Sequence, residues 1–188
     1  MPKIIAIGGV PATGKTTLMF KIISMADDWK VIKPQKLLDA MFSKKLRTVI
    51  LGKYQDDGNV FQGTDRLSMA VQPDAEKFFE EVKEQKINVL FEGDRLFNAK
   101  MLNSLSESYS ESDFRIVVIQ ANHDIVEQRH IDRKDDQDEK FKRSRETKIS
   151  NISGNLQLMD YIDTVDNNNL DDQKLIIEYI SKHFNWSE

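Results

Sequence analysis

Residues 9–16 constrain the fold of this chain more than any other segment, because they read GVPATGKT and match the pattern G-x-x-x-x-G-K-[ST]. A continuous apolar run, residues 4–7, leads directly into this segment and is typical of a strand buried on both faces of a parallel sheet. After the segment, apolar residues recur at three- and four-residue spacing and predict a helix over residues 15–26. These residues therefore predict a strand, a glycine-rich turn and a helix.

The motif at residues 9–16 is a Walker A motif, and its fixed positions have physical roles in holding a triphosphate. Backbone N–H groups of such a loop converge on phosphate oxygens at the positive end of the following helix. Lys15 is expected to reach the β- and γ-phosphates, Thr16 to ligate Mg²⁺, and Thr17 to assist at the α-phosphate. The expected nucleotide contacts in the loop are Gly9, Ala12, Thr13, Gly14, Lys15, Thr16 and Thr17. The motif thus predicts ATP and Mg²⁺ as cofactors.

Composition predicts one folded domain spanning residues 1–188, with 39% hydrophobic and 31% charged residues. The absence of cysteine excludes disulfides and thiolate metal sites and suits the cytoplasm, which would be the host cytoplasm for a viral protein. The apolar run at 4–7 is too short to span a membrane, so no membrane partner is expected. The net charge of −4 argues against broad coating of a polyanion, so any nucleic-acid contact should be local. Oligomeric state is left open.

The remaining apolar patterns alternate between strands and helices. Further strands are predicted at residues 87–91, 114–119 and 161–165, with a weaker one at 31–32. Helices are predicted at 73–82, 99–105, 124–133 and 171–184. This alternation predicts an α/β fold with a doubly wound, parallel, five-stranded sheet. Residues 49–61 contain Asp57 followed by Gly58, a pair favoured in tight turns, and predict an inserted hairpin.

In its Walker A motif and its element order, the chain resembles the P-loop kinase superfamily of nucleoside, nucleotide and small-metabolite kinases. The patterns N-K-x-D and D-x-x-G, typical of GTP-binding switch proteins, do not occur in the sequence. The resemblance implies a phosphotransferase that uses ATP, on a P-loop kinase sheet with a helical lid.

Acidic side chains follow the predicted strand at 87–91, at the sheet edge where doubly wound folds place ligands. Phosphoryl transfer needs a carboxylate to orient or deprotonate the acceptor hydroxyl, so Glu92 or Asp94 is the expected base. Nucleoside kinases carry a glutamate followed by arginine at a similar place, which favours Glu92, although Gly93 and Asp94 separate it from Arg95 here. Alternatively, either carboxylate caps a helix or holds Mg²⁺ through water.

Acceptor binding is predicted for Asp65, Arg66 and Arg95, because the first two lie in a segment with no evident packing role. The alternative for that segment is a helix cap made by Thr64 or Asp65. Asn167 follows the last predicted strand, where small kinases pack a loop against adenine, and is a candidate base contact.

Residues 127–148 are dense in charge and predict a helical lid that closes over the phosphates. Arg133 and Arg143 are the leading candidates to neutralise the transferred phosphate, and Arg145 and Lys148 to bind the acceptor. The alternative is a solvated helical pair, in which neighbouring aspartate and glutamate side chains pair with the basic ones.

Three short segments, residues 63–68, 91–95 and 145–151, look like those of phage-type P-loop kinases that phosphorylate 5-hydroxymethyluracil in DNA. This resemblance implies a modified-DNA acceptor, whose target base would leave the stack and present its hydroxyl to Glu92 or Asp94. A free nucleoside, nucleotide or small metabolite would suit the same motifs. A non-catalytic ATP-binding regulatory module is the alternative from another class.

Overall fold

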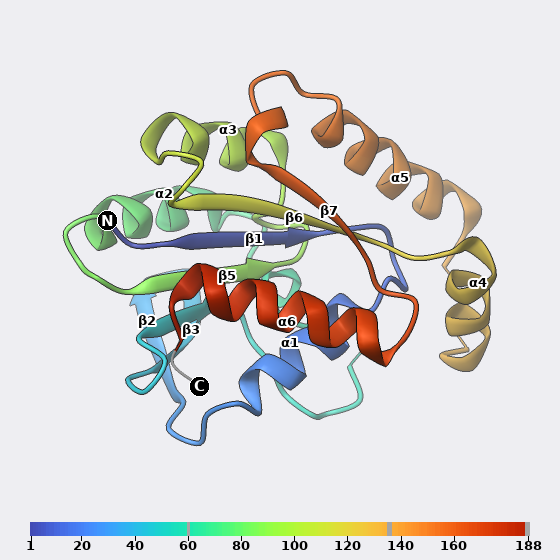
Figure 1. Cartoon of the computed structure of the whole chain (residues 1–188), viewed down its shortest axis with the longest axis horizontal. Coiled ribbons are helices and arrows are strands. Elements are labelled where there is room, and N and C mark those ends of the chain that lie inside the picture. The colour runs from blue at the N-terminus through green and yellow to red at the C-terminus, as the bar shows by residue number, and fades with distance from the viewer. Residues whose placement is uncertain (60, 135–136, 187–188) are drawn as a thin grey trace.

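One mixed sheet organises the computed structural model, which describes residues 1–59, 61–134 and 137–186. In this part of the chain seven strands lie in the order β2-β3-β4-β5-β1-β6-β7, with six α-helices around them (Figure 1). The strands are β1 (Ile4–Gly8), β2 (Lys30–Gln35), β3 (Leu38–Ser43), β4 (Thr48–Leu51), β5 (Asn88–Glu92), β6 (Phe114–Gln120) and β7 (Ile162–Asp166). The helices are α1 (Lys15–Ile23), α2 (Gln72–Val82), α3 (Ala99–Ser108), α4 (His123–Asp132), α5 (Glu139–Ser153) and α6 (Leu170–Phe184). The chain therefore has an α/β fold.

The expected five-stranded parallel sheet is corrected to this seven-stranded mixed sheet. The neighbours β4-β5, β5-β1, β1-β6 and β6-β7 are parallel, whereas β2 and β3 add an antiparallel extension to β4. Val31 and Ile32 lie in the edge strand β2, where Val31 is 83% exposed, so this strand is not buried on both faces. Sequence patterning missed β3, because its apolar run, Ala40 to Phe42, is only three residues long and lies between Asp39 and Ser43.

The predicted hairpin at residues 49–61 is wrong. Its first part belongs to β4, whose Val49 and Ile50 are paired in parallel with β5. All four residues of β4 are buried, as suits a strand inside the sheet rather than an inserted hairpin. Asp57 and Gly58 instead lie in a loop closed by one antiparallel bridge between Lys53 and Gly63. Val60, also part of the prediction, lies outside the described residues.

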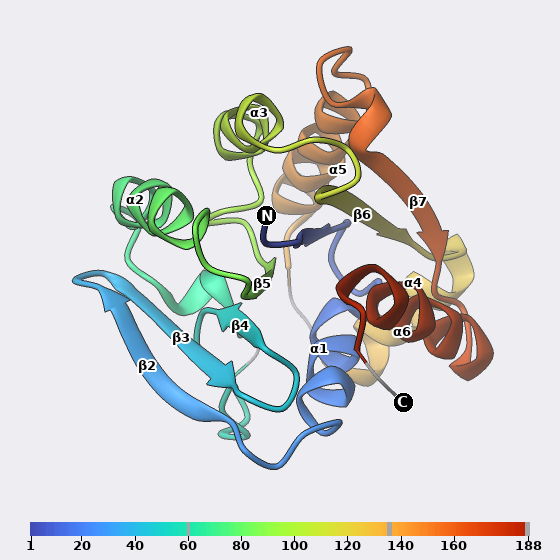
Figure 2. The same ribbon diagram turned by 60° about the vertical axis from the view of Figure 1, so that its left-hand side comes forward.

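Helices cover both faces of the sheet, as the alternating pattern predicts (Figure 2). On one face, α2 and α3 bury apolar side chains that include Phe78, Phe79 and Met101. On the other face, α1 and α6 bury Leu18 and Ile176. The parallel strands therefore lie between two layers of helices, and their carboxyl ends lie along one edge of the sheet.

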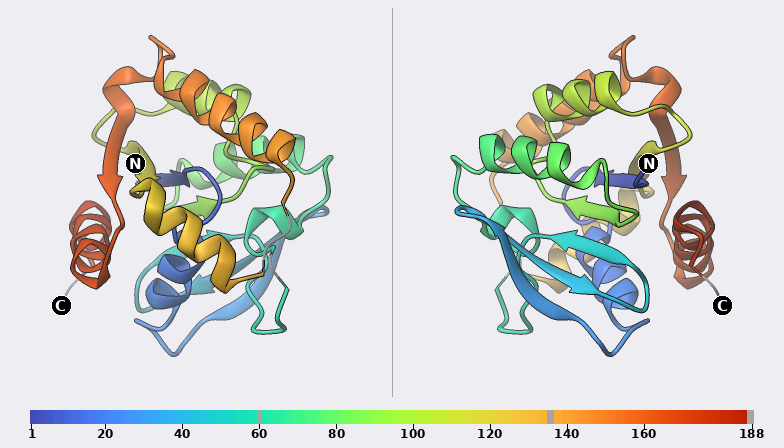
Figure 3. Two further views of the ribbon diagram at one scale, coloured as in Figure 1. Left: turned by 90° about the vertical axis from the view of Figure 1, so that its right-hand side faces the viewer. Right: turned by 90° about the vertical axis from the view of Figure 1, so that its left-hand side faces the viewer.

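Several predicted helix boundaries change; the helix expected at 99–105, for example, continues to Ser108. The first helix, expected to reach residue 26, ends at Ile23, and Met25 beyond it is 45% exposed because the chain turns towards β2. The lid predicted at 127–148 corresponds to α4 and α5, and α5 continues to Ser153; residues 135–136 lie outside the described chain. Figure 3 shows α4 and α5 on the side of the molecule to which β1 points. No helix in the described ranges is long and apolar enough to cross a membrane.

Candidate functional site

The loop between β1 and α1 is a tight turn built on unusual backbone angles. Gly9 and Gly14 have φ values of 148° and 90°, and a Cβ atom at Gly9 would lie 2.3 Å from the main-chain oxygen of Ile119. Ala12 also has a positive φ, 63°, which is uncommon for a residue with a side chain. The Walker A glycine at position 9 is therefore required by its close approach to β6.

Lys15, the first residue of α1, folds back over this loop. Its Nζ donates hydrogen bonds to the main-chain oxygens of Gly9, at 2.7 Å, and Val10, at 2.9 Å. Burial lowers the pKa of Lys15, while the negative charge of Glu92 opposes that shift. A partly buried ammonium thus lies against the main chain of the loop, and the negative charges of nearby carboxylates favour its charged form.

Two side chains that are distant from the loop in the sequence form hydrogen bonds that support it. Asn167, which follows β7, is buried, and its Nδ2 donates to the main-chain oxygen of Thr13 at 2.7 Å. Arg129 of α4 donates from Nη1 to Ala12 O at 3.2 Å and from Nη2 to Asn167 O at 2.9 Å. The amide donor of Asn167, predicted to contact a base, is therefore used to support the loop.

A cavity of about 100 Å³ opens at the carboxyl edge of the sheet beside this loop. It is bordered by the loop, the end of β5, the segment before α2, and α5. Among the predicted site residues it brings together Gly9, Ala12, Lys15, Thr16, Asp65, Glu92, Asp94, Arg133 and Arg145. Residues that are far apart in the sequence thus meet around one opening.

Glu92, the last residue of β5, is 3% exposed and lines this cavity. Tyr54 Oη donates to Glu92 Oε1 at 3.3 Å, and Thr64 Oγ1 donates to the main-chain oxygen of Glu92 at 2.8 Å. Burial raises the pKa of Glu92 to about 7, although the positive charge of Lys15 lowers it in part. At neutral pH this carboxyl group can therefore both accept and release a proton.

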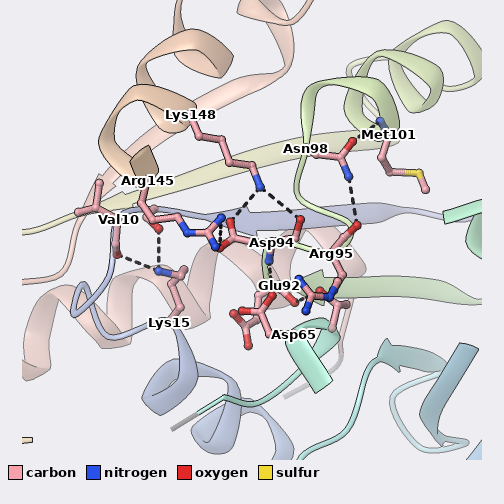
Figure 4. A network of polar contacts seen from close by, with 12 residues as sticks. Val10, Lys15, Asp65, Glu92, Asp94, Arg95, Asn98, Met101, Arg145 and Lys148 are labelled. Atoms are coloured by element: carbon pink, nitrogen blue, oxygen red, sulfur yellow. Dashed lines mark hydrogen bonds and ion pairs between the residues drawn. The ribbon is translucent and has the colours of Figure 1, made fainter. Parts of the chain in front are cut away.

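Asp94 has a different environment, because its carboxylate is ion-paired with α5 (Figure 4). Arg145 lies 2.8 Å from Asp94 Oδ2, and Lys148 lies 2.9 Å from Oδ1. The main-chain N–H of Asp94 donates to Asp65 Oδ1 at 2.7 Å. Burial raises the pKa of Asp65, and the nearby charge of Asp94 adds to this shift. Asp94 therefore ties the predicted lid to the loop after β5.

The other predicted site residues lie around the rim or away from the cavity. Arg66 pairs with Asp57 at 2.9 Å, and Arg143 is an exposed residue of α5 that does not line the cavity. Arg95 is not a lining residue either, but its positive charge partly offsets the rise that burial causes in the pKa of Asp65. Tyr54, which contacts Glu92, has no sequence motif that could have identified it.

A second cavity, of about 360 Å³, lies on the other side of the start of α1. Gly14 and Thr17 border it, and Arg133 borders both cavities. Its remaining lining residues come from α4, from the segment after β7 and from α6: Arg129, Asp132, Asn167, Asn169, Leu170 and Gln173. The Walker A motif therefore lies between two neighbouring cavities.

Gly63 packs against the carboxylate site, which predicts a stability effect. Gly63→Ala is expected to reduce the free energy of unfolding by about 1–3 kcal/mol, because φ is 66° and the new Cβ would lie 2.5 Å from Glu92 Oε1. Gly58→Ala is the matched control, since φ there is 73° but no atom lies within 4 Å. Denaturant unfolding of both variants separates packing from backbone strain; equal losses would contradict the packing at Gly63.

Comparisons with known proteins add little. No protein-family model matches the chain, and no curated protein matches it. A solved structure of an uncharacterized protein from Eubacterium ventriosum ATCC 27560 is similar over 97% of this chain and 99% of that one, at 18% identity and a TM-score of 0.46. A likeness this weak carries no inference about fold or function.

Proposed function

We propose that this chain is an ATP-dependent phosphotransferase that moves the γ-phosphate to a hydroxyl group of a nucleotide-like acceptor. The observation that carries the proposal is that Lys15 of the Walker A motif and the buried carboxyl group of Glu92 line the same cavity. Phosphoryl transfer depends mainly on positioning and charge neutralisation, so a phosphate-binding cation beside a proton acceptor is the combination it needs.

The loop between β1 and α1 would bind the β- and γ-phosphates. In that complex Lys15 Nζ would exchange its hydrogen bonds to the carbonyl oxygens of Gly9 and Val10 for hydrogen bonds to phosphate oxygens. The Thr16 hydroxyl lines the cavity together with Asp65 and Asp94, and such hard oxygen ligands suit Mg²⁺. When bound, Mg²⁺ supplies further positive charge to the phosphates.

Glu92 is the better candidate for the base. Its pKa of about 7 matches the pH at which it would act, whereas the carboxylate of Asp94 is held in two ion pairs. The acceptor hydroxyl would give its proton to Glu92 while its oxygen forms a bond to the γ-phosphorus. The bond from that phosphorus to the β–γ bridging oxygen breaks, and its electron pair leaves with ADP.

Basic side chains of α4 and α5 would offset the charge on the transferred group. Arg133 and Arg145 line the cavity, so both can reach it, and Arg145 becomes available once it leaves Asp94. Arg143 faces solvent and is a weaker candidate. Phe61 and Phe141 also border the cavity, and aromatic rings there favour an acceptor with a nucleobase, such as 5-hydroxymethyluracil in DNA.

The direct test uses γ-labelled ATP and Mg²⁺ with separate pools of nucleosides, nucleoside monophosphates, ordinary DNA and DNA containing 5-hydroxymethyluracil. We expect Lys15-dependent transfer of label to a nucleotide-like acceptor, with modified DNA as the favoured pool. Label on a free nucleoside or nucleotide would keep the phosphotransferase and change its acceptor. ATP binding without transfer to any pool would favour a regulatory module.

A further inference from the structure

Gln173 is a buried polar residue with an unused side chain. It lies in α6, is 5% exposed and lines the second cavity beside Thr17. Its Oε1 atom is buried and accepts no hydrogen bond from the described residues. Because a buried acceptor without a partner is costly, it points to a ligand that supplies a donor.

The neighbouring carboxamide side chains already form hydrogen bonds within the protein. Asn167 Nδ2 donates to Thr13 O, and Asn169 Oδ1 accepts the main-chain N–H groups of Asp171 and Asp172. Among the cavity's described amide side chains, Gln173 therefore stands out by a buried acceptor that no hydrogen bond uses.

The position of this cavity relates it to the nucleotide. On the proposed function, the γ-phosphate lies beside Glu92 in the first cavity, and the triphosphate crosses the loop at Lys15. The other end of the nucleotide then emerges at Gly14 and Thr17, which border the second cavity. Its volume of about 360 Å³ falls within the usual range for small-molecule sites.

We propose that Gln173 hydrogen-bonds the edge of the adenine ring and makes the site selective for ATP over GTP, an inference that rests on the proposed phosphotransferase. A carboxamide offers one donor beside one acceptor. Adenine complements this pair at both edges that carry its N6 amine, using the amine with either N1 or N7. Guanine complements it at only one of the two edges that carry O6, since O6 and N7 are both acceptors.

The test measures the dissociation constants of Mg·ATP and Mg·GTP by calorimetry, without an acceptor. For the wild-type protein we expect ATP to bind about tenfold more tightly or better. Gln173→Leu removes the donor and the acceptor and should weaken ATP binding about 10- to 100-fold, with little change for GTP. Gln157→Leu is the matched control, because Gln157 is an exposed residue whose amide contacts Ser106 and Glu107, outside the second cavity.

Gln173→Glu gives a second readout that does not depend on loss of binding. A carboxylate only accepts hydrogen bonds, so it suits the N1–H and N2 amine of guanine and repels N1 or N7 of adenine. This variant should therefore prefer GTP. An unchanged ATP-to-GTP ratio in both variants, with folding verified by circular dichroism, would overturn the role of Gln173.

The two proposals fail in different ways. A wild-type protein that transfers phosphate but binds ATP and GTP equally overturns the role of Gln173 and leaves the phosphotransferase intact. A wild-type protein that binds neither nucleotide overturns both.

Discussion

Lys15→Met is expected to reduce phosphate transfer from ATP by about 10²–10³-fold or more, because it removes the cation at the β- and γ-phosphates. Methionine keeps most of the length of the side chain. Since burial lowers the pKa of Lys15, the charge is costly in the fold, and the melting temperature should not fall appreciably. A steady-state assay with labelled ATP measures the loss, and thermal unfolding verifies the fold.

The matched control for this variant is Lys21→Met, in the same helix but outside both cavities. It should retain wild-type transfer. Comparable activity in Lys15→Met and Lys21→Met would contradict the role of the Walker A lysine and, with it, the proposed chemistry.

Glu92→Gln is expected to lower kcat by about 10²–10⁴-fold, because the amide cannot take the proton of the acceptor hydroxyl. The pKa of Glu92 is raised to about 7, so the group is protonated and inactive below that pH. Wild-type kcat/KM should therefore rise with pH through about 7 and then level off. Residual activity of the variant should lack this acidic limb, which a pH series at low acceptor concentration measures.

The variant Asp94→Asn distinguishes between the two carboxylates that could act as the base. It weakens the ion pairs with Arg145 and Lys148, so it should change acceptor affinity or lid closure more than the pH dependence. The acidic limb near pH 7 should remain. If Asp94→Asn instead removes the limb and Glu92→Gln preserves it, Asp94 is the base.

Local patterns predicted the elements around the Walker A motif well, because each depends on near neighbours in sequence. The strand at 4–7, the loop and the following helix correspond to β1 and α1. Residues 49–51 were misread since their partner, β5, is about forty residues further on, and the apolar run does not reveal parallel pairing. Likewise, β3 was missed because its apolar run is only three residues long, and its pairing with β2 and β4 cannot be read from the sequence.

The candidate site likewise combines residues that local sequence identified with residues that only the fold brings close to them. The sequence predicted that Glu92 and Asp94 both lie at the end of a strand. Their electrostatic environments differ because α5 supplies the two cations that form ion pairs with Asp94. Gln173 did leave a signal, because it precedes Ile176 by three residues and so interrupts the apolar face of α6 with a polar group. Tyr54 reaches Glu92 only through the fold of the loop before Gly63.

The outer strand β2 also bears on how copies of this protein behave in solution. An open sheet edge offers unpaired N–H and C=O groups to any passing strand. In β2, however, Lys30 and Lys33 place charge along the edge, Pro34 lacks an N–H, and the pairing with β3 is irregular between Ile32 and Gln35. Edge-to-edge polymerisation is therefore disfavoured on this side, even though Val31 presents an exposed apolar side chain there.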